Sequence, residues 1–368
     1  MKYLQNPLWA EMPTNENLSQ YPTILDILED IAEQEEHNCS TIDPICRNVI
    51  TQMLRRGHFL VSKEKDSPNV NLLPTGREIE VLYRGQSKFY EYCSPSLYRN
   101  WTEEKQLLTH LQMSEFKLLL DSHPILNEIT NTPLHHPMIN TPIRLGINYE
   151  GLAQHYGIHT SLLDFSNDKW VSAFFAVTSY DEKTDQYSVI NPSHSLTNCY
   201  GVFYIYRNDY NSSSRQNAYP IGLHYFNRPG AQSGFALPMK NNQNLNELPN
   251  CQKIFFRHDS KANECVYRMN QHSRALFPED DLIDLVQKIK DNNRHFSKDA
   301  IDACYNNYYK EMPRTDYDML LTRNQIFSIE HPFVTFSKEK IMEEIAKWEN
   351  GDRERYIQSL IVCSFYRI

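Results

Sequence analysis

The sequence predicts an α+β protein, with a mixed β-sheet core and helical additions at both ends. Short runs rich in β-branched and aromatic residues, at positions 77–84, 160–165 and 201–206, have the composition of strands. Longer stretches around them place apolar residues three and four positions apart, which is the spacing of an amphipathic helix. No internal repeat is visible, so we expect one core sheet rather than a repeat array.

Residues 1–75 are predicted to form an N-terminal helical appendage. One amphipathic helix is expected over residues 23–36, and a second begins after Asp43, which can cap it. The last turn of the second helix contains two arginines, which interact favourably with the helix dipole. Residues 67–76 contain two prolines and two asparagines, so we predict a linker there.

Residues 76–290 are predicted to form the main domain. Its first strand covers residues 77–84, and its other expected elements are helices at 102–121, 149–156, 170–178 and 282–289, strands at 160–165 and 201–206, and loops at 132–142 and 208–217. Gly157 can close the second helix in the left-handed conformation, and Asn167 or Asp168 can cap the third.

Residues 291–368 are predicted to form a C-terminal helical extension. A helix is expected at 341–348, and the apolar residues at 357–366 indicate a final strand or apolar segment.

Composition limits the possible partners and compartments. The formal net charge is −9, which disfavours nucleic acid as a partner for the whole surface. The longest apolar stretch, 170–177, is far below the roughly 20 residues that a membrane helix needs, and the N-terminus lacks the layout of a signal peptide. The eight cysteines are scattered without a C-x-x-C pair, so we expect reduced thiols and a cytoplasmic location.

Five segments in series resemble the FRG domain family, which is named for an aromatic-Arg-Gly tripeptide. They read YRGQ at 83–86, PSLYR at 95–99, GLAQHYG at 151–157, TSLLDFS at 160–166 and AFFA at 173–176. A later segment, RPGAQSGF at 228–235, resembles the Gln-x-Gly part of that family. The resemblance covers roughly residues 77–289. Tyr83 stands where the family usually has Phe, and Phe165-Ser166 stands where it often has Trp-Thr.

The same order of strands, hydroxyl groups and helix is similar to that of the ADP-ribosyltransferase superfamily. This second resemblance implies a split sheet and NAD as a substrate, with Arg84 on phosphate or ribose and Ser161 or Ser166 as the strand hydroxyl. Gln232 would occupy the position of the catalytic glutamate, but a neutral amide cannot act as a base. Either Asp164, Glu247 or Glu330 supplies a carboxylate, or the site binds its ligand without turnover.

The implied function is therefore an NAD-consuming ADP-ribosyltransferase or glycohydrolase that serves as a toxin or as an antiviral effector in phage defence. The alternative is a non-catalytic module that senses a ligand or binds a protein through the same pocket. The resemblance implies a nucleotide as the small-molecule ligand, and it names no protein target.

Three of the expected site residues have two interpretations each. The guanidinium of Arg84 suits a phosphate or carboxylate ligand, or it pairs internally with Asp164. His155 acts as an acid or base near neutral pH, or it caps the helix that precedes it. Asp164 anchors the turn that follows it, or it orients Arg84 or His155.

We expect Arg84, Gln154, His155, Asp164 and Gln232 to converge on one cleft, with Arg84, His155, Asp164 and Gln232 in the catalytic roles. The residues expected to bind the ligand are Tyr83, Gly85, Gln86, Arg99, Gln154, Tyr156, Thr160, Ser161, Ser166 and Arg228. We also expect Gly85 to let the ligand approach the backbone closely. No metal is expected, because Gly157 breaks the helix that would bring His155 and His159 to one face.

Overall fold

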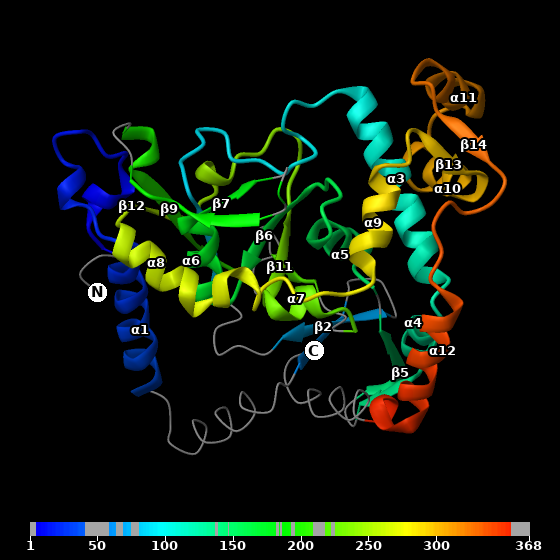
Figure 1. Ribbon diagram of the computed structural model, residues 1–368, viewed down its shortest axis with the longest axis horizontal. Helices are drawn as coiled ribbons and strands as arrows, with labels where there is room; N and C mark the ends of the chain where they lie inside the picture. Colours follow the sequence, from blue (N-terminus) through cyan, green and yellow to red (C-terminus); the bar gives the residue numbers. More distant parts are fainter. Residues whose placement is uncertain are drawn as a thin grey trace.

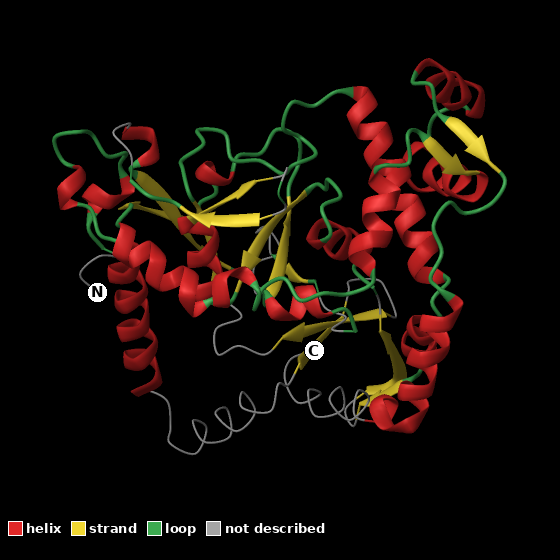
Figure 2. Cartoon of the chain, in the orientation of Figure 1, coloured by secondary structure: helices red, strands yellow, loops and turns green. Residues whose placement is uncertain are grey.

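A computed structural model of the protein describes residues 5–40, 59–63, 69–74, 81–136, 139–145, 147–181, 184, 186–192, 196–208, 218–221 and 225–354. Within these residues helices and antiparallel strands are both abundant, so the α+β prediction is confirmed (Figure 2). No helix in this described part is long and apolar enough to cross a membrane.

The centre of the molecule is a six-stranded sheet in which every neighbouring pair is antiparallel. Its strands, in spatial order, are β10 (Tyr219–Pro220), β11 (Gly234–Pro238), β6 (Leu162–Ser166), β3 (Val81–Gln86), β9 (Tyr200–Arg207) and β12 (Cys251–Arg257). The expected strands at 77–84, 160–165 and 201–206 correspond to β3, β6 and β9. Short apolar runs, alternating only at 77–84, were therefore sufficient to find the three strands at the centre.

Parallel strand pairs occur outside the central sheet. A four-stranded sheet contains β1 (Phe59–Lys63), β2 (Asn69–Pro74), β5 (Ile139–Leu145) and β4 (Leu134–His136), with β2 and β5 parallel. Two further pairs are β7 (Thr178–Asp181) with β8 (Gln186–Val189), which is antiparallel, and β13 (His295–Ser297) with β14 (Phe327–Ile329), which is parallel.

Two of the predictions from proline content are wrong. Residues 69–74 of the expected linker form β2, and most of the expected loop at 132–142 forms β4 and part of β5. Proline is tolerated at strand ends and irregularities, where no ladder N–H is needed. Pro74 is the last residue of β2, and Pro142 lies where the register between β4 and β5 shifts.

Three helices lie along one face of the central sheet. They are α1 (Ile24–Ser40), α6 (Lys169–Val177) and α8 (Ser260–Met269), and α6 packs directly on β3 and β9 (Figure 1). Asp168 begins α6 by accepting a hydrogen bond from the amide of Trp170 at 2.7 Å, as the sequence suggested. The helices and the sheet share one apolar cluster that includes Ile24, Ile27 and Phe174, all of them fully buried.

The longest helix of the described chain is α3 (Glu103–Asp121), and it is contacted by α4 (Pro124–Asn131), α5 (Tyr149–His155), α9 (Leu282–Lys290) and α10 (Lys298–Cys304) (Figure 1). The remaining helices are α7 (Asn227–Ala231), which contacts α5, and α11 (Arg314–Arg323) and α12 (Lys338–Lys347). Short 3-10 turns occur at Pro7–Ala10, Leu18–Gln20, Leu196–Asn198, Leu245–Glu247 and Gln271–Ser273, and π-helical turns at Tyr305–Tyr309 and Trp348–Asp352. Two further apolar clusters pack around α3.

The expected helices at 23–36, 102–121, 149–156, 170–178, 282–289 and 341–348 correspond to α1, α3, α5, α6, α9 and α12. Gly157 has φ of +86°, so it adopts the left-handed conformation after α5 that the sequence predicted. The expected helix after Asp43, the final segment at 357–366 and almost all of the expected loop at 208–217 lie outside the described residues.

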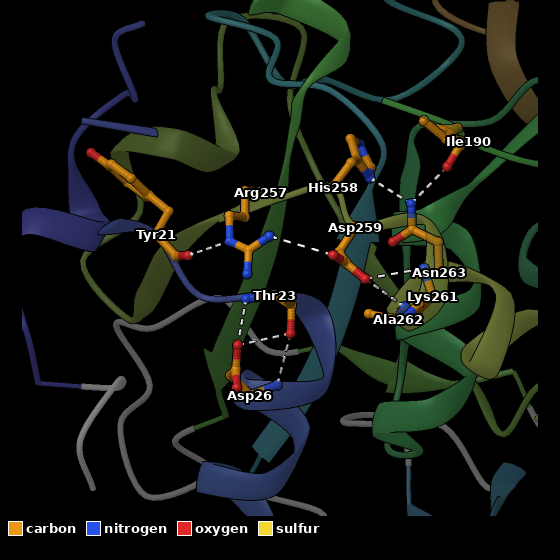
Figure 3. Close-up of polar contacts among 10 residues, drawn as sticks. All are labelled: Tyr21, Thr23, Asp26, Ile190, Arg257, His258, Asp259, Lys261, Ala262 and Asn263. Atoms are coloured by element: carbon orange, nitrogen blue, oxygen red, sulfur yellow. Dashed lines mark hydrogen bonds and ion pairs between the residues drawn. The ribbon is translucent and has the colours of Figure 1, made fainter. Parts of the chain in front are cut away.

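Polar contacts fasten the N-terminal segment to the edge of the central sheet (Figure 3). Arg257 at the end of β12 donates from Nε to the carbonyl oxygen of Tyr21 at 3.2 Å and pairs with Asp259 at 3.5 Å. Asp259 in turn caps α8, because its carboxylate accepts from two amides of the first turn at 3.0 Å. One arginine therefore connects the start of α1 with the start of α8.

His258, the residue between these two, is held as a neutral ring. Its Nε2 lies 2.9 Å from the carbonyl oxygen of Ser87, so Nε2 carries the proton, and Nδ1 then accepts from the amide of Asn263 at 3.1 Å. Burial lowers the pKa of His258, which agrees with a neutral ring.

A half-buried histidine, His110 of α3, should make stability depend on pH. Its ring stacks on Tyr308 with centroids 4.0 Å apart, and burial lowers its pKa from 6.5 to about 4. A base whose pKa is lowered in the folded state stabilises the fold fully above pH ~6.5 and loses that contribution as the pH falls towards 4. The loss is at most about 3 kcal/mol for this group.

The measurement is urea unfolding of the wild type and of His110→Phe at pH 7.5 and pH 5. We expect the wild type to lose more stability on acidification than the variant, because phenylalanine keeps the stacked ring but has no proton to bind. The comparison between the two proteins cancels the parallel contributions of His155 and His258, whose pKa values are also lowered by burial. Equal losses in both proteins would contradict the prediction.

Candidate functional site

The candidate site lies where the central sheet opens between β3 and β6. These two strands share a single residue pair, Tyr83 with Ser166, whereas β3 pairs with β9 along its whole length. The next pair in the antiparallel register would be Arg84 with Phe165, and it is not formed. The two groups of three strands on either side of this opening are therefore joined by one residue pair alone.

Arg84 bridges this opening. Its NH1 donates to the main-chain carbonyl oxygen of Asp164 at 2.7 Å, at the point where the ladder between the strands has ended. The contact is made with the backbone and not with the carboxylate, so the side chain of Asp164 is available to other partners. That side chain is exposed to solvent. The Nε of Arg84 is buried and has no hydrogen-bond partner among the described residues.

A second guanidinium, that of Arg99, lies close to Arg84. Its Nε donates to the carbonyl oxygen of Ser94 at 2.8 Å. Burial and the charge of Arg84 lower the pKa of Arg99, while the carboxylate of Asp164 opposes them. Two arginines that repel each other beside one carboxylate leave an excess of positive charge, and an anionic ligand would offset it.

His155 occupies the last position of α5, and its imidazole is the least satisfied group of the site. Both ring nitrogens are buried without a hydrogen-bond partner among the described residues. The ring packs on Gly234, where an added Cβ would lie 2.9 Å from two of its atoms. Burial lowers the pKa of His155; Asp164 opposes this shift, and Arg228 adds to it. The imidazole is therefore neutral at pH 7.

Arg228 of α7 completes this part of the site. Its NH1 donates to the carbonyl oxygen of His155 at 3.3 Å, and its guanidinium carbon lies 5.2 Å from the ring centre of Tyr156 and 5.6 Å from that of Phe277. The Nε of Arg228 is buried without a partner in the described chain. Tyr156 donates to Asp280 at 2.5 Å, and burial raises the pKa of both groups.

Several other predicted site residues instead hold segments of the fold together. Thr160 donates to Gln154 at 2.6 Å, and the amide of Gln154 donates to the carbonyl oxygen of Leu162 at 3.3 Å. Ser161 donates to Glu150 at 2.7 Å. These contacts join α5 to the start of β6. They therefore fix the position of His155, the last residue of α5.

The amide of Gln232 is already engaged. Its Nε2 donates to the carbonyl oxygen of Leu276 at 3.0 Å, and the main-chain oxygen of Gln232 accepts from Ser166 at 2.8 Å. Ser166 and Gln232 are both buried, with exposed fractions of 4% and 8%. Their contacts connect β6 with the turn before β11, and the charge-bearing group near His155 is Asp164.

The YRGQ segment distributes its side chains over both faces of β3. The hydroxyl of Tyr83 donates to Glu35 of α1 at 3.4 Å, and Gln86 donates to the thiol of Cys93 at 3.4 Å. A Cβ at Gly85 would lie 1.9 Å from the carbonyl oxygen of Ser172. The space beside Gly85 is therefore filled by α6, and the glycine allows the helix to approach rather than a ligand.

The carboxylates of Glu247 and Glu330 were the alternatives to Asp164. Glu247 accepts from the amide of Asn244 at 3.3 Å, within the loop that covers Cys93. Glu330 is exposed and follows β14, which packs on α10 (Figure 1). Asp164 is the one of the three whose charge acts on both Arg99 and His155.

Sequence reasoning missed several residues that surround the candidate site. Tyr204 and Cys251 lie near the charge of Arg84, which lowers the pKa of both. Burial outweighs this effect, raises the pKa of Tyr204 and raises that of Cys251 to about 12. Phe277 and Asp280 lie beside Arg228 and Tyr156. Tyr204 falls in the buried strand β9, but Phe277 and Asp280 stand in a segment without periodicity, so no sequence pattern could have indicated them.

The fold and site define an α+β protein with a split antiparallel sheet and a cationic group at the opening. Residues 79–185 match the family model of the FRG domain, so the chain contains an FRG domain. The match includes Arg84, Arg99, His155 and Asp164, whereas Arg228 and Gln232 lie beyond it. No curated protein and no solved structure matches the chain.

Proposed function

We propose that the protein binds NAD at the opening between β3 and β6 and cleaves the bond between nicotinamide and ribose. The observation that carries the proposal is the set of buried, unpartnered nitrogens in the described site, which belong to Arg84, His155 and Arg228. A buried polar group without a partner costs about 1–3 kcal/mol. A ligand with several acceptor oxygens would satisfy these groups.

A dinucleotide diphosphate suits the arginines. Guanidinium groups form charge-assisted and often bidentate hydrogen bonds with phosphate oxygens. Arg84 is close enough to Arg99 to lower its pKa, so one diphosphate would bind both. Arg228, which contacts His155, would then bind another part of the same ligand.

Asp164 would supply the carboxylate that stabilises the developing cation. The bond from C1′ of the ribose to the nicotinamide nitrogen breaks, nicotinamide leaves with the electron pair, and positive charge develops on the ribose. A water oxygen then bonds to C1′ and releases one proton, which the neutral imidazole of His155 can accept. If a side chain of a target protein replaces the water, the same step is ADP-ribosyl transfer.

An enzyme of this kind would consume cytoplasmic NAD or modify a protein target, and either activity would suit a toxin or an antiviral effector. The expected location is the cytoplasm, where cysteines such as Cys93 and Cys304 would remain reduced thiols.

Replacing Asp164 by asparagine tests the chemical step. We expect NAD binding to change by less than threefold and nicotinamide release to fall on the order of 100-fold, because the charge on the carboxylate matters most in the transition state. Calorimetry with millimolar NAD measures binding, and chromatography measures released nicotinamide. The matched control is Asp284→Asn, an exposed carboxylate on α9, which should behave like the wild type.

A non-catalytic ligand-sensing module is the second candidate, and one observation favours it. The residue at the position of the superfamily's catalytic glutamate is neutral, and its amide is committed to Leu276. Gln232→Glu would place a carboxylate against that carbonyl oxygen, so we expect lower stability and no gain in turnover. Wild-type protein that binds NAD without releasing nicotinamide would support the sensing module. Increased release by Gln232→Glu would assign the carboxylate role to position 232 instead of Asp164.

A further inference from the structure

The C-terminal helix α12 reaches the candidate site through one carboxylate. Glu344 of α12 accepts from the hydroxyl of Tyr225 at 2.5 Å and lies 3.1 Å from Nε2 of His123, whose side chain is 1% exposed. These partners hold the pKa of Glu344 below its ordinary value, so the carboxylate is charged. Glu344 therefore joins α12, the start of α4 and the segment that begins at Tyr225.

Tyr225 lies two residues before α7, the helix that carries Arg228. α7 has five residues, and its N-cap Phe226 makes no capping hydrogen bond through its side chain. A helix this short does not hold its own position, because its stability comes from contacts with the rest of the fold. The anchors at the start of α7 are therefore Phe226, which is buried beside His123, and Tyr225, which is bound by Glu344.

The position of α7 decides what Arg228 touches. Its guanidinium meets the carbonyl oxygen of His155 at 3.3 Å, which is near the upper limit of a hydrogen bond, and two aromatic rings complete its surroundings. A small rotation of the five-residue helix would break this contact and move a positive charge away from the imidazole of His155.

We propose that Glu344 is a positioning residue for the candidate site: by holding Tyr225 it keeps α7 in place, and α7 keeps Arg228 beside His155. The proposal rests on the proposed function for its consequence in NAD binding, but the placement of Arg228 is independent of it. The FRG match ends at residue 185, so the C-terminal extension supplies a support that the matched segment lacks.

The test is Glu344→Gln, which keeps the size of the side chain and removes its charge. We expect the KM for NAD to rise about five- to tenfold with kcat little changed, because the variant weakens a ligand contact and leaves the reacting groups in place. Tyr225→Phe keeps the ring and loses the hydroxyl, so it should give the same change. The double variant should be no worse than either single variant, since both remove one contact.

A second readout needs no ligand. In ligand-free protein with labelled histidines, NMR titration of the His155 imidazole should give a higher pKa in both variants than in the wild type, because the positive charge of Arg228 has moved away. A merely structural loss elsewhere in α12 would leave this value unchanged. The matched control is Glu343→Gln, the neighbouring exposed residue that pairs only with Lys347 among the described contacts.

The two readouts distinguish a failure of the NAD proposal from a failure of the positioning role. A raised pKa of His155 in Glu344→Gln and Tyr225→Phe supports the positioning role even if the wild type does not bind NAD, and in that case only the NAD proposal fails. An unchanged pKa of His155 in both variants, or an equal rise in Glu343→Gln, would overturn the positioning role.

Discussion

Replacing Arg84 by alanine is expected to abolish detectable NAD binding and nicotinamide release. The variant removes a guanidinium from the opening between β3 and β6, and each charge-assisted hydrogen bond to phosphate is worth about 1.5–3 kcal/mol. If Arg84 makes two such bonds to the diphosphate, the loss would exceed 100-fold in Kd and move weak binding beyond the range of calorimetry.

Arg84→Lys and Arg268→Ala are the controls. Lysine keeps the positive charge but cannot make a bidentate contact, so it should restore part of the affinity. Arg268 is exposed on α8 and pairs with Glu264, and its removal should leave NAD binding unchanged. If expression of the protein arrests growth, Arg84→Ala should relieve the arrest. Arrest that persists in this variant, or NAD binding like that of the wild type, would show that the activity lies elsewhere in the chain.

Replacing Gly85 by alanine should have the largest effect on stability. The added Cβ would lie 1.9 Å from the carbonyl oxygen of Ser172 and 2.7 Å from the backbone nitrogen of Ala176. Neither atom can move without shifting α6, so we expect a loss of roughly 3 kcal/mol, at the upper end of what overpacking a core costs. Urea unfolding followed by circular dichroism measures this loss.

Two additional variants identify which atoms of α6 the added Cβ would contact too closely. Ser172→Ala should not rescue Gly85→Ala, because the clash is with the main-chain oxygen and not with the serine hydroxyl. Ala176→Gly should rescue only a small part, since it removes the Cβ contact at 2.7 Å and leaves the backbone contacts. A Gly85→Ala protein as stable as the wild type, or one that loses NAD binding without losing stability, would restore the interpretation that the glycine admits a ligand.

The sequence predicted the principal elements well where apolar periodicity was long. The helices at α1, α3, α9 and α12 have an apolar stripe, and β3, β6 and β9 coincide with short, mostly buried apolar runs. It failed where prolines were counted without their positions. Pro74 and Pro142 stand at a strand end and at a register shift, where a missing N–H does no harm, so β2, β4 and β5 were missed.

The site was harder to predict than the elements. Motif order marked Arg84, His155 and Asp164, and the structure brings Arg84 into contact with the backbone of Asp164 and His155 into contact with Arg228. The same motifs also marked Gly85 and Thr160, which serve the packing of α6 and the start of β6. A sequence motif contains residues that stabilise the fold as well as residues that bind a ligand. The motif alone does not distinguish the two kinds.

By itself, the sequence determined that the chain is α+β and contains an FRG domain. Both conclusions depend on periodicity and motifs among residues that are close together in the chain. Only the tertiary structure decided that the sheet opens after Tyr83 and Ser166, that α6 fills the space beside Gly85, and that Glu344 binds Tyr225. These features join residues separated by up to 119 positions along the chain, and no local pattern encodes which distant side chain completes a contact. They depend on how whole elements pack against one another. That packing determines which nitrogens of the candidate site are buried without a partner and which charges lie near each other.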